Sequence, residues 1–244
     1  MVELAYPAFV VLLGYVVLGI TGFGSALVIV PLLAWRWPLP EVVALAILMD
    51  VPASILHGGL NLRQVNFAEL RRLLPGMAVG TLAGLWLTGI LDPRWPLLAL
   101  GLYVSAVGAN ALRPRPSSAQ RTLAAPWAHG MGLAIGVVEM LFGTAGPLAV
   151  AWLSRRLKDV HVLRASTPVI LVVSASAVLL GMGWTGRLSS GDLWSRWASL
   201  MGFAVVGVLL GNRLVRWVSA DTLRKVICGL LTVSGLTLVL HAWG

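Results

Sequence analysis

The chain has 244 residues, of which 58% are hydrophobic and only 11% are charged, and its mean hydropathy is +0.89. Soluble proteins are about 45–50% apolar and about 25% charged, so this composition excludes an ordinary soluble protein and predicts an integral membrane protein. The formal net charge is +9. The basic residues lie in short loops between apolar segments, where membrane topology and anionic lipid headgroups explain them. We therefore expect the lipid bilayer as a partner, and no nucleic acid.

Eight apolar blocks follow one another along the chain, separated by breaks that carry Arg, Pro or Asp. Blocks of about 20 residues match the length of a helix that crosses a hydrocarbon core about 30 Å thick. The blocks cover approximately residues 4–35, 39–60, 73–91, 95–112, 127–153, 162–183, 193–215 and 222–243. We therefore predict an all-α polytopic membrane protein. Residues 1–112 form a first transmembrane repeat, 113–126 a cytoplasmic linker and 127–244 a second transmembrane repeat of the same membrane domain.

The two halves of the chain carry similar patterns of small residues. Residues 22–33 match 143–154 at an offset of 121, and at slightly longer offsets 80–87 match 207–214 and Gly101 matches Gly229. Each match alone is also typical of generic small-residue packing between membrane helices. Matches in the same order in both halves predict an internal duplication.

The distribution of Lys and Arg tests the topology. Eight single crossings would place 8 and 10 of the 18 basic residues on the two sides, against the usual cytoplasmic excess of basic residues. If the first and fifth blocks are instead hairpins of two half-helices, all but four basic residues lie inside. Each half is then a re-entrant hairpin plus three spans, so the halves are inverted and both termini lie outside. The four outside residues are Arg36, Arg94, Arg187 and Arg196.

Glycines interrupt the first and fifth blocks at the expected hairpin tips. Backbone amides at such a tip must be satisfied by protein, water or ligand, because lipid offers no partner. Helix N-termini bind anions, and facing broken helices are a recurring transporter design. The alternatives are helix packing for the glycines and capping for the hydroxyls. The predicted substrate-binding residues are Thr21, Gly22, Gly24, Ser25, Gly143, Thr144, Gly146, Ser166 and Thr167.

Three ionisable residues fall inside apolar blocks, where a charge is costly and is a functional candidate by default. Asp50 and His57 lie two turns apart on one helix face. They are candidates for proton coupling, because imidazole titrates near neutral pH; alternatively, they satisfy helix ends or each other. Glu139 lies one turn before the second glycine tip and would repel an anion unless protonated or paired. It is a third candidate for proton coupling, or a structural partner of His129 or Arg164.

The segments GFGSALVIVP and FGTAGPLAV, with four apolar blocks in each half and a basic linker, resemble the TauE/SafE family, also called the toluene sulfonate uptake permease family. The resemblance covers essentially the whole chain. It implies movement of sulfite, sulfoacetate or a related sulfur-containing anion across the cytoplasmic membrane. Several positions depart from the glycine-rich family pattern, so the resemblance specifies the family more closely than the substrate. They are Ser25, Ala26, Ala145, Pro147 and Trp152.

We therefore expect a secondary transporter of a small sulfur-containing anion, an exporter that works by alternating access. The sequence has no GxxxxGK[ST] motif, so any coupling is to an ion gradient or to the substrate's own gradient. The alternatives are an anion channel, a non-transporting scaffold, or an intramembrane enzyme that uses Asp50 and His57. HExxH and GxSxG are absent from the sequence, and we expect no enzyme. The single cysteine, Cys228, is too little for a metal or haem site, and we expect no cofactor.

Overall fold

The computed structural model describes residues 2–58, 62–92, 94–112, 124, 126–157, 159–214 and 220–243. These ranges are helical throughout, apart from short turns and loops. The helices in the first half are α1 (Val2–Thr21), α2 (Ser25–Leu33), α3 (Leu39–Gly58), the 3-10 helix η1 (Leu62–Gln64), α4 (Phe67–Ile90) and α5 (Arg94–Leu112). Those in the second half are α6 (Trp127–Phe142), α7 (Gly146–Arg156), α8 (Val160–Trp184), α9 (Gly191–Leu214) and α10 (Ala220–Trp243).

Five of the described helices, α1, α3, α4, α8 and α9, are long and apolar enough to cross a membrane. The prediction of an all-α polytopic membrane protein is therefore confirmed. Most of the predicted linker lies outside the described residues, and the division into repeats 1–112 and 127–244 stays a prediction.

The first apolar block is broken into two arms. Gly22 and Gly24 have φ angles of +82° and +95°, which glycine adopts at little cost, and α2 begins directly after them. The arms run antiparallel: the Tyr6 hydroxyl donates to the Leu32 carbonyl oxygen at 2.8 Å, and a Cβ added at Gly14 would lie 2.5 Å from Ile29. The chain thus reverses at the predicted glycines.

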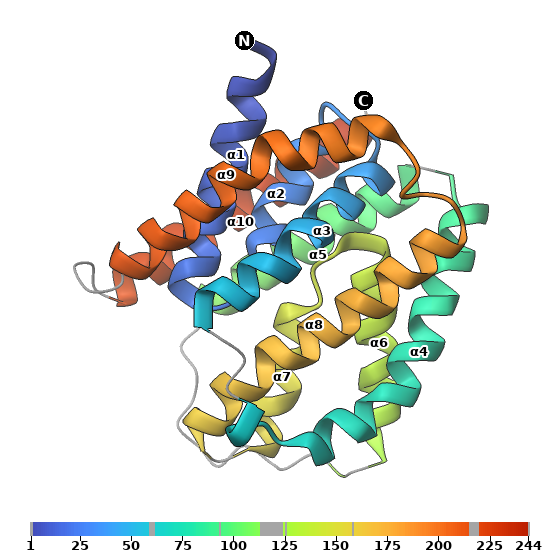
Figure 1. Ribbon diagram of the computed structural model, residues 1–244, viewed down its shortest axis with the longest axis vertical. Helices are drawn as coiled ribbons and strands as arrows, with labels where there is room; N and C mark the ends of the chain where they lie inside the picture. Colours follow the sequence, from blue (N-terminus) through green and yellow to red (C-terminus); the bar gives the residue numbers. More distant parts are fainter. Residues whose placement is uncertain are drawn as a thin grey trace.

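The two arms of this hairpin differ in length. With 20 residues, α1 is about 30 Å long, whereas the 9 residues of α2 span about 13 Å. The expectation of two half-helices is therefore wrong for the first arm, which has the length of a full span. Figure 1 shows its N-terminal end projecting beyond the neighbouring helices.

The fifth block is broken at Gly143, whose φ is +64°. The 16 residues of α6 and the 11 residues of α7 lie on either side of the break. In Figure 1 these two helices diverge from a turn near the centre of the molecule. The second predicted break is thus present, with two short arms.

Glycines allow the main helix pairs to approach closely. Between α4 and α6, a Cβ added at Gly80 would lie 2.2 Å from the Leu133 carbonyl oxygen. Between α9 and α1, a Cβ added at Gly211 would lie 2.4 Å from the Val16 carbonyl oxygen. Side chains at these glycines would force the helices apart, so small residues set these interfaces.

The helix α4 begins earlier than hydropathy predicts, at Phe67 rather than residue 73. The Asn66 side chain caps it by accepting a hydrogen bond from the Glu69 amide at 3.1 Å. Its first two turns carry Glu69, Arg71 and Arg72, which lowers the hydropathy of a segment that is nevertheless helical. The cap thus brings charged residues into the first turns of a membrane helix.

Candidate functional site

The two broken helices meet around a small cavity. A Cβ added at Gly146, the first residue of α7, would lie 2.8 Å from the Phe23 ring in the first break. The cavity has a volume of about 30 Å³, where about 10–15 Å³ is enough for one water molecule. The first hairpin, the second hairpin, α3 and α8 all contribute to its wall. The lining includes Gly24, Ser25, Asp50, Glu139, Gly143, Thr144 and Gly146.

The start of α2 is linked to Asp50 of α3. The Ser25 hydroxyl donates to Asp50 Oδ1 at 2.6 Å, and the Tyr15 hydroxyl of α1 donates to the same oxygen at 2.7 Å. Ser25 and Tyr15 are both buried, with exposed fractions of 1% and 0%. The carboxyl of Asp50 therefore joins three helices beside the cavity.

The start of α7 is linked to Glu139 of α6. The Ala145 amide donates to Glu139 Oε2 at 2.8 Å, and the Tyr103 hydroxyl of α5 donates to the Thr144 carbonyl oxygen at 2.9 Å. The Thr144 Oγ1 atom is buried and has no hydrogen-bond partner among the described residues. Glu139 thus bonds within its own hairpin, and the described contacts do not pair it with His129 or Arg164, so that alternative is wrong.

Five predicted site residues lie elsewhere. The Thr21 hydroxyl bonds to the carbonyl oxygens of Val17 and Phe23 near the end of α1. Gly22 faces His57 instead of the cavity, with its added Cβ 3.5 Å from His57 Nε2. Neither His57 nor Gly22 lines the cavity, and His57 is not in contact with Asp50 through any described hydrogen bond. The alternative that Asp50 and His57 satisfy each other finds no support among the described hydrogen bonds, and their role in proton coupling stays a prediction.

Ser166 and Thr167 of α8 make structural hydrogen bonds away from the cavity. The Ser166 Oγ atom accepts from the Asn66 amide at 2.9 Å, which ties α8 to the start of α4. The Thr167 hydroxyl donates to the Leu163 carbonyl oxygen of its own helix at 2.9 Å. Both contacts match the alternative of capping and packing.

Two tyrosines at the site were missed by the sequence reasoning. Tyr15 and Tyr103 reach Asp50 and Thr144 across 35 and 41 residues of sequence. Their only signal is a buried hydroxyl in the middle of an apolar block, which must find a polar partner.

The family model described as Sulfite exporter TauE/SafE matches residues 7–238 of the chain. The chain belongs to the TauE/SafE family. It is 47% identical over 201 residues to the probable inner membrane transporter protein TsaS of Comamonas testosteroni, and the match covers 82% of this chain and 83% of that relative. No solved structure matches the chain. This TauE/SafE protein is thus a multi-pass membrane transporter of the inner membrane, and the suspected family is confirmed.

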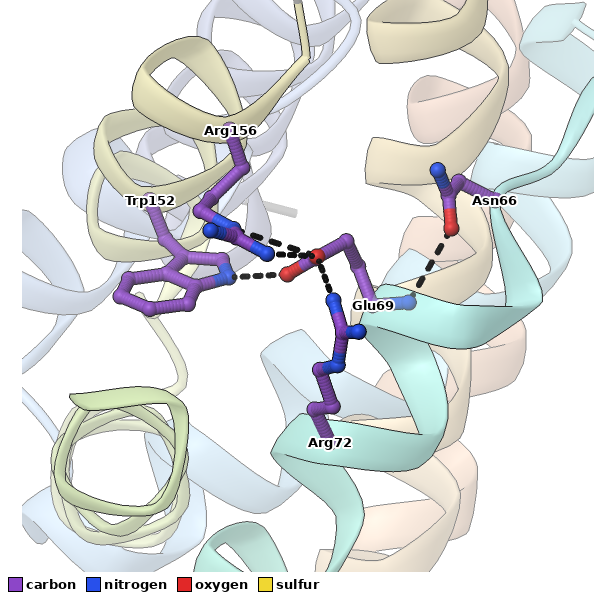
Figure 2. A network of polar contacts seen from close by, with 5 residues as sticks. All are labelled: Asn66, Glu69, Arg72, Trp152 and Arg156. Carbon is purple, nitrogen blue, oxygen red and sulfur yellow. Dashed lines mark hydrogen bonds and ion pairs between the residues drawn. The ribbon is translucent and has the colours of Figure 1, made fainter. Parts of the chain in front are cut away.

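A second polar cluster of this TauE/SafE transporter, centred on Glu69, was also not predicted from the sequence. Glu69 is only 3% exposed, and it accepts hydrogen bonds from Arg72 at 2.6 Å, from Arg156 Nη2 at 2.9 Å and from Trp152 Nε1 at 3.0 Å. Figure 2 shows these three side chains converging on the Glu69 carboxylate, with Asn66 at the cap. The cluster joins the second arm of the α6–α7 hairpin to the start of α4.

The described wall of the cavity carries acidic but no basic side chains. Asp50 and Glu139 line it, and the lining residues that the structure describes include no Lys, Arg or His. Positive electrostatic potential at this place comes from the N-terminal ends of α2 and α7. An anion in the cavity would therefore be held by backbone amides and hydroxyls beside two carboxyl groups.

Proposed function

We propose that this protein is a secondary transporter of a small sulfur-containing anion, such as sulfite, sulfoacetate or another organosulfonate, and that it works by alternating access. The supporting observation is that two helix starts, α2 and α7, open on one cavity at the glycine breaks. Helix N-termini attract anions through free amides and the helix dipole. In many transporters, such broken helices face each other at the substrate site.

The size of the cavity favours a small oxyanion. A volume of about 30 Å³ suits a few water-sized atoms, as in sulfite, better than a larger organosulfonate. A larger substrate requires the hairpin arms to separate. We therefore name sulfite as the first substrate to test, with export as the direction that the family description suggests.

We also propose that the two halves are inverted repeats. Gly80 and Gly84 of α4 face α6, while Gly207 and Gly211 of α9 face α1, so the matched glycines occupy matched interfaces. An offset of 127 relates these residues.

The pair α5 and α10 gives the same offset. Gly101 contacts Gly235, and Gly108 contacts Cys228. The offset of 127 relates Gly101 to Cys228 and Gly108 to Gly235, so the two contacts are equivalent in the two halves. This offset pairs Gly101 with Cys228, one residue before the sequence match at Gly229. Paired interfaces of this kind allow one half to move against the other.

Solute counterflow tests the proposed function. Purified protein in liposomes loaded with unlabelled sulfite should accumulate external radiolabelled sulfite, since a carrier exchanges bound substrate across the membrane. A channel would equilibrate sulfite without counterflow, and a scaffold would give no protein-dependent flux. Either result would reject the proposal.

A matched pair of variants links the flux to the cavity. Gly146→Leu places a side chain between α7 and Phe23, so counterflow should fall at least tenfold. Gly130→Leu is the control, because a Cβ added at Gly130 has no described atom within 4 Å, and its flux should stay near the wild-type value. Equal losses in both variants would indicate a general folding defect instead of a site in the cavity.

A further inference from the structure

The carboxyl group of Glu139 lies where an anion would bind at the start of α7. Gly143, with its φ of +64°, turns the chain so that the side chain of residue 139 meets the backbone of residue 145. The Ala145 amide then donates to Glu139 Oε2 at 2.8 Å. Glu139 is 5% exposed and lines the cavity. The helix of 11 residues that follows attracts negative charge at this end, and the protein's own carboxyl group takes the position.

Thr144 provides an independent indication of a ligand. Its side chain is 4% exposed and lines the same cavity, yet its Oγ1 atom has no hydrogen-bond partner among the described residues. Buried hydroxyl groups nearly always have a partner. A ligand with acceptor oxygens beside Ala145 and Thr144 would supply one.

We propose that Glu139 is a tethered stand-in for the substrate: the anion displaces its carboxylate from the Ala145 amide, and the displaced carboxylate takes up one proton. This inference rests on the function proposed above. The proton comes from solvent and forms an O–H bond on Glu139, so one negative charge enters the cavity and one is neutralised. No bond in the anion changes.

Electrostatics requires this exchange. Among the described residues, the wall of the cavity carries no basic side chain, so an anion and an ionised Glu139 would repel each other at short range in a poorly solvated place. Asp50 faces the same cavity from α3, and Tyr103 approaches from α5 through its bond to Thr144. The cavity-lining residues of α8 are Leu171, Val172 and Ala175, and α4 presents Gly80, Thr81 and Gly84 to α6, so these two helices add no charge.

Asp50 does not occupy the equivalent position at the start of α2. Its carboxyl accepts from the hydroxyls of Ser25 and Tyr15, whereas Glu139 accepts from a backbone amide. Among the described contacts, no carboxyl group therefore caps the first amides of α2 while Asp50 keeps its bonds. This difference assigns the displacement to Glu139 alone.

Sulfite binding to the purified full-length protein tests the inference by isothermal titration calorimetry. Titrations in two buffers of different ionisation enthalpy give the number of protons taken up per anion. Sulfite itself titrates near neutral pH, so the readout is the difference between proteins at one pH. Wild type should take up about one proton more than Glu139→Gln, and Glu41→Gln, a surface control, should match wild type. Asp50→Asn should keep the wild-type proton number.

Affinity gives a second readout. As the pH rises from 6 to 8.5, the ratio of the wild-type affinity for sulfite to that of Glu139→Gln should fall by up to tenfold per pH unit. This is the slope expected for one coupled proton. At pH 8 the variant should bind at least tenfold more tightly than wild type. Parallel pH profiles, equal proton numbers, or loss of the proton only in Asp50→Asn would overturn the inference.

Infrared difference spectroscopy of the wild-type protein covers the case in which Glu139→Gln does not fold. Addition of sulfite should produce a carboxylic-acid C=O band and remove carboxylate absorption, and spectra without this change would also overturn the inference. Folded wild-type protein that binds no sulfite and gives no counterflow would instead overturn the proposed function.

Discussion

Loss of the charge on Glu69 should destabilise the protein more than loss of an exposed acidic residue. The Glu69→Gln side chain keeps its shape and an oxygen that can accept from Trp152, but it removes the negative charge from the buried pair with Arg156. The side chains of Glu69 and Arg156 are 4% and 19% exposed, and breaking a buried pair costs about 3–5 kcal/mol. Arg72 is 45% exposed and adds less than about 1 kcal/mol. Because Arg156 can regain some water, we expect a loss of about 2–3 kcal/mol.

The surface pair of Glu41 and Arg196 offers a matched control. It has a similar length, 2.8 Å, but side-chain exposed fractions of 46% and 26%, so Glu41→Gln should cost less than about 1 kcal/mol. Thermal unfolding in detergent, followed by circular dichroism, measures both variants. For a chain of this size, 1 kcal/mol shifts Tm by about 2–4 °C, so Tm should fall by at least about 4 °C in Glu69→Gln. Equal shifts in the two variants would refute the reasoning from burial.

Three further predictions concern the helix contacts. Gly80→Ala should lower Tm by several degrees, because its Cβ would lie 2.2 Å from a carbonyl oxygen of α6. Gly130→Ala should leave Tm unchanged, because no described atom lies within 4 Å of its added Cβ. A larger fall of Tm in Gly130→Ala than in Gly80→Ala would contradict close packing of α4 against α6 at Gly80. Asn66→Ala removes the cap of α4 and should cost about 1 kcal/mol, measured in the same assay; an unchanged Tm would show that the cap is not stabilising. Cysteines at Leu4 and Trp35, in a cysteine-free background, should react with an impermeant maleimide from the same side of the membrane; labelling from opposite sides would contradict the first hairpin.

Local patterns predicted the breaks in the fold better than the helix ends. Glycine breaks were visible because Gly22, Gly24 and Gly143 interrupt apolar blocks, and only glycine adopts such positive φ angles readily. The early start of α4 was missed because charged residues lower the hydropathy of its first turns. The signal was present, since Asn66 followed three residues later by Glu69 is typical of a helix N-terminus.

The site was predictable only in part because its contacts are distant in sequence. Ser25, Asp50, Glu139, Thr144 and Gly146 were predicted and do line the cavity, along with Gly24 and Gly143. A break in a helix does not specify which neighbouring residues turn inward, so the other predicted site residues face elsewhere. No local spacing links a tyrosine to a carboxyl group 35 residues away, or Glu69 to an arginine 87 residues away.

The proposed coupling through Glu139 also has a consequence for direction. If hydrogensulfite, a monovalent anion, moves with one proton, the transported charge is zero, and a proton gradient directed inward favours uptake. Export then requires a higher anion concentration in the cytoplasm, which the substrate's own gradient supplies. In liposomes, reversing the pH gradient should therefore reverse net sulfite flux, while a potassium diffusion potential set with valinomycin should leave it unchanged. Flux that follows the potential instead would show that the anion crosses without its proton, because only an uncompensated charge responds to membrane voltage.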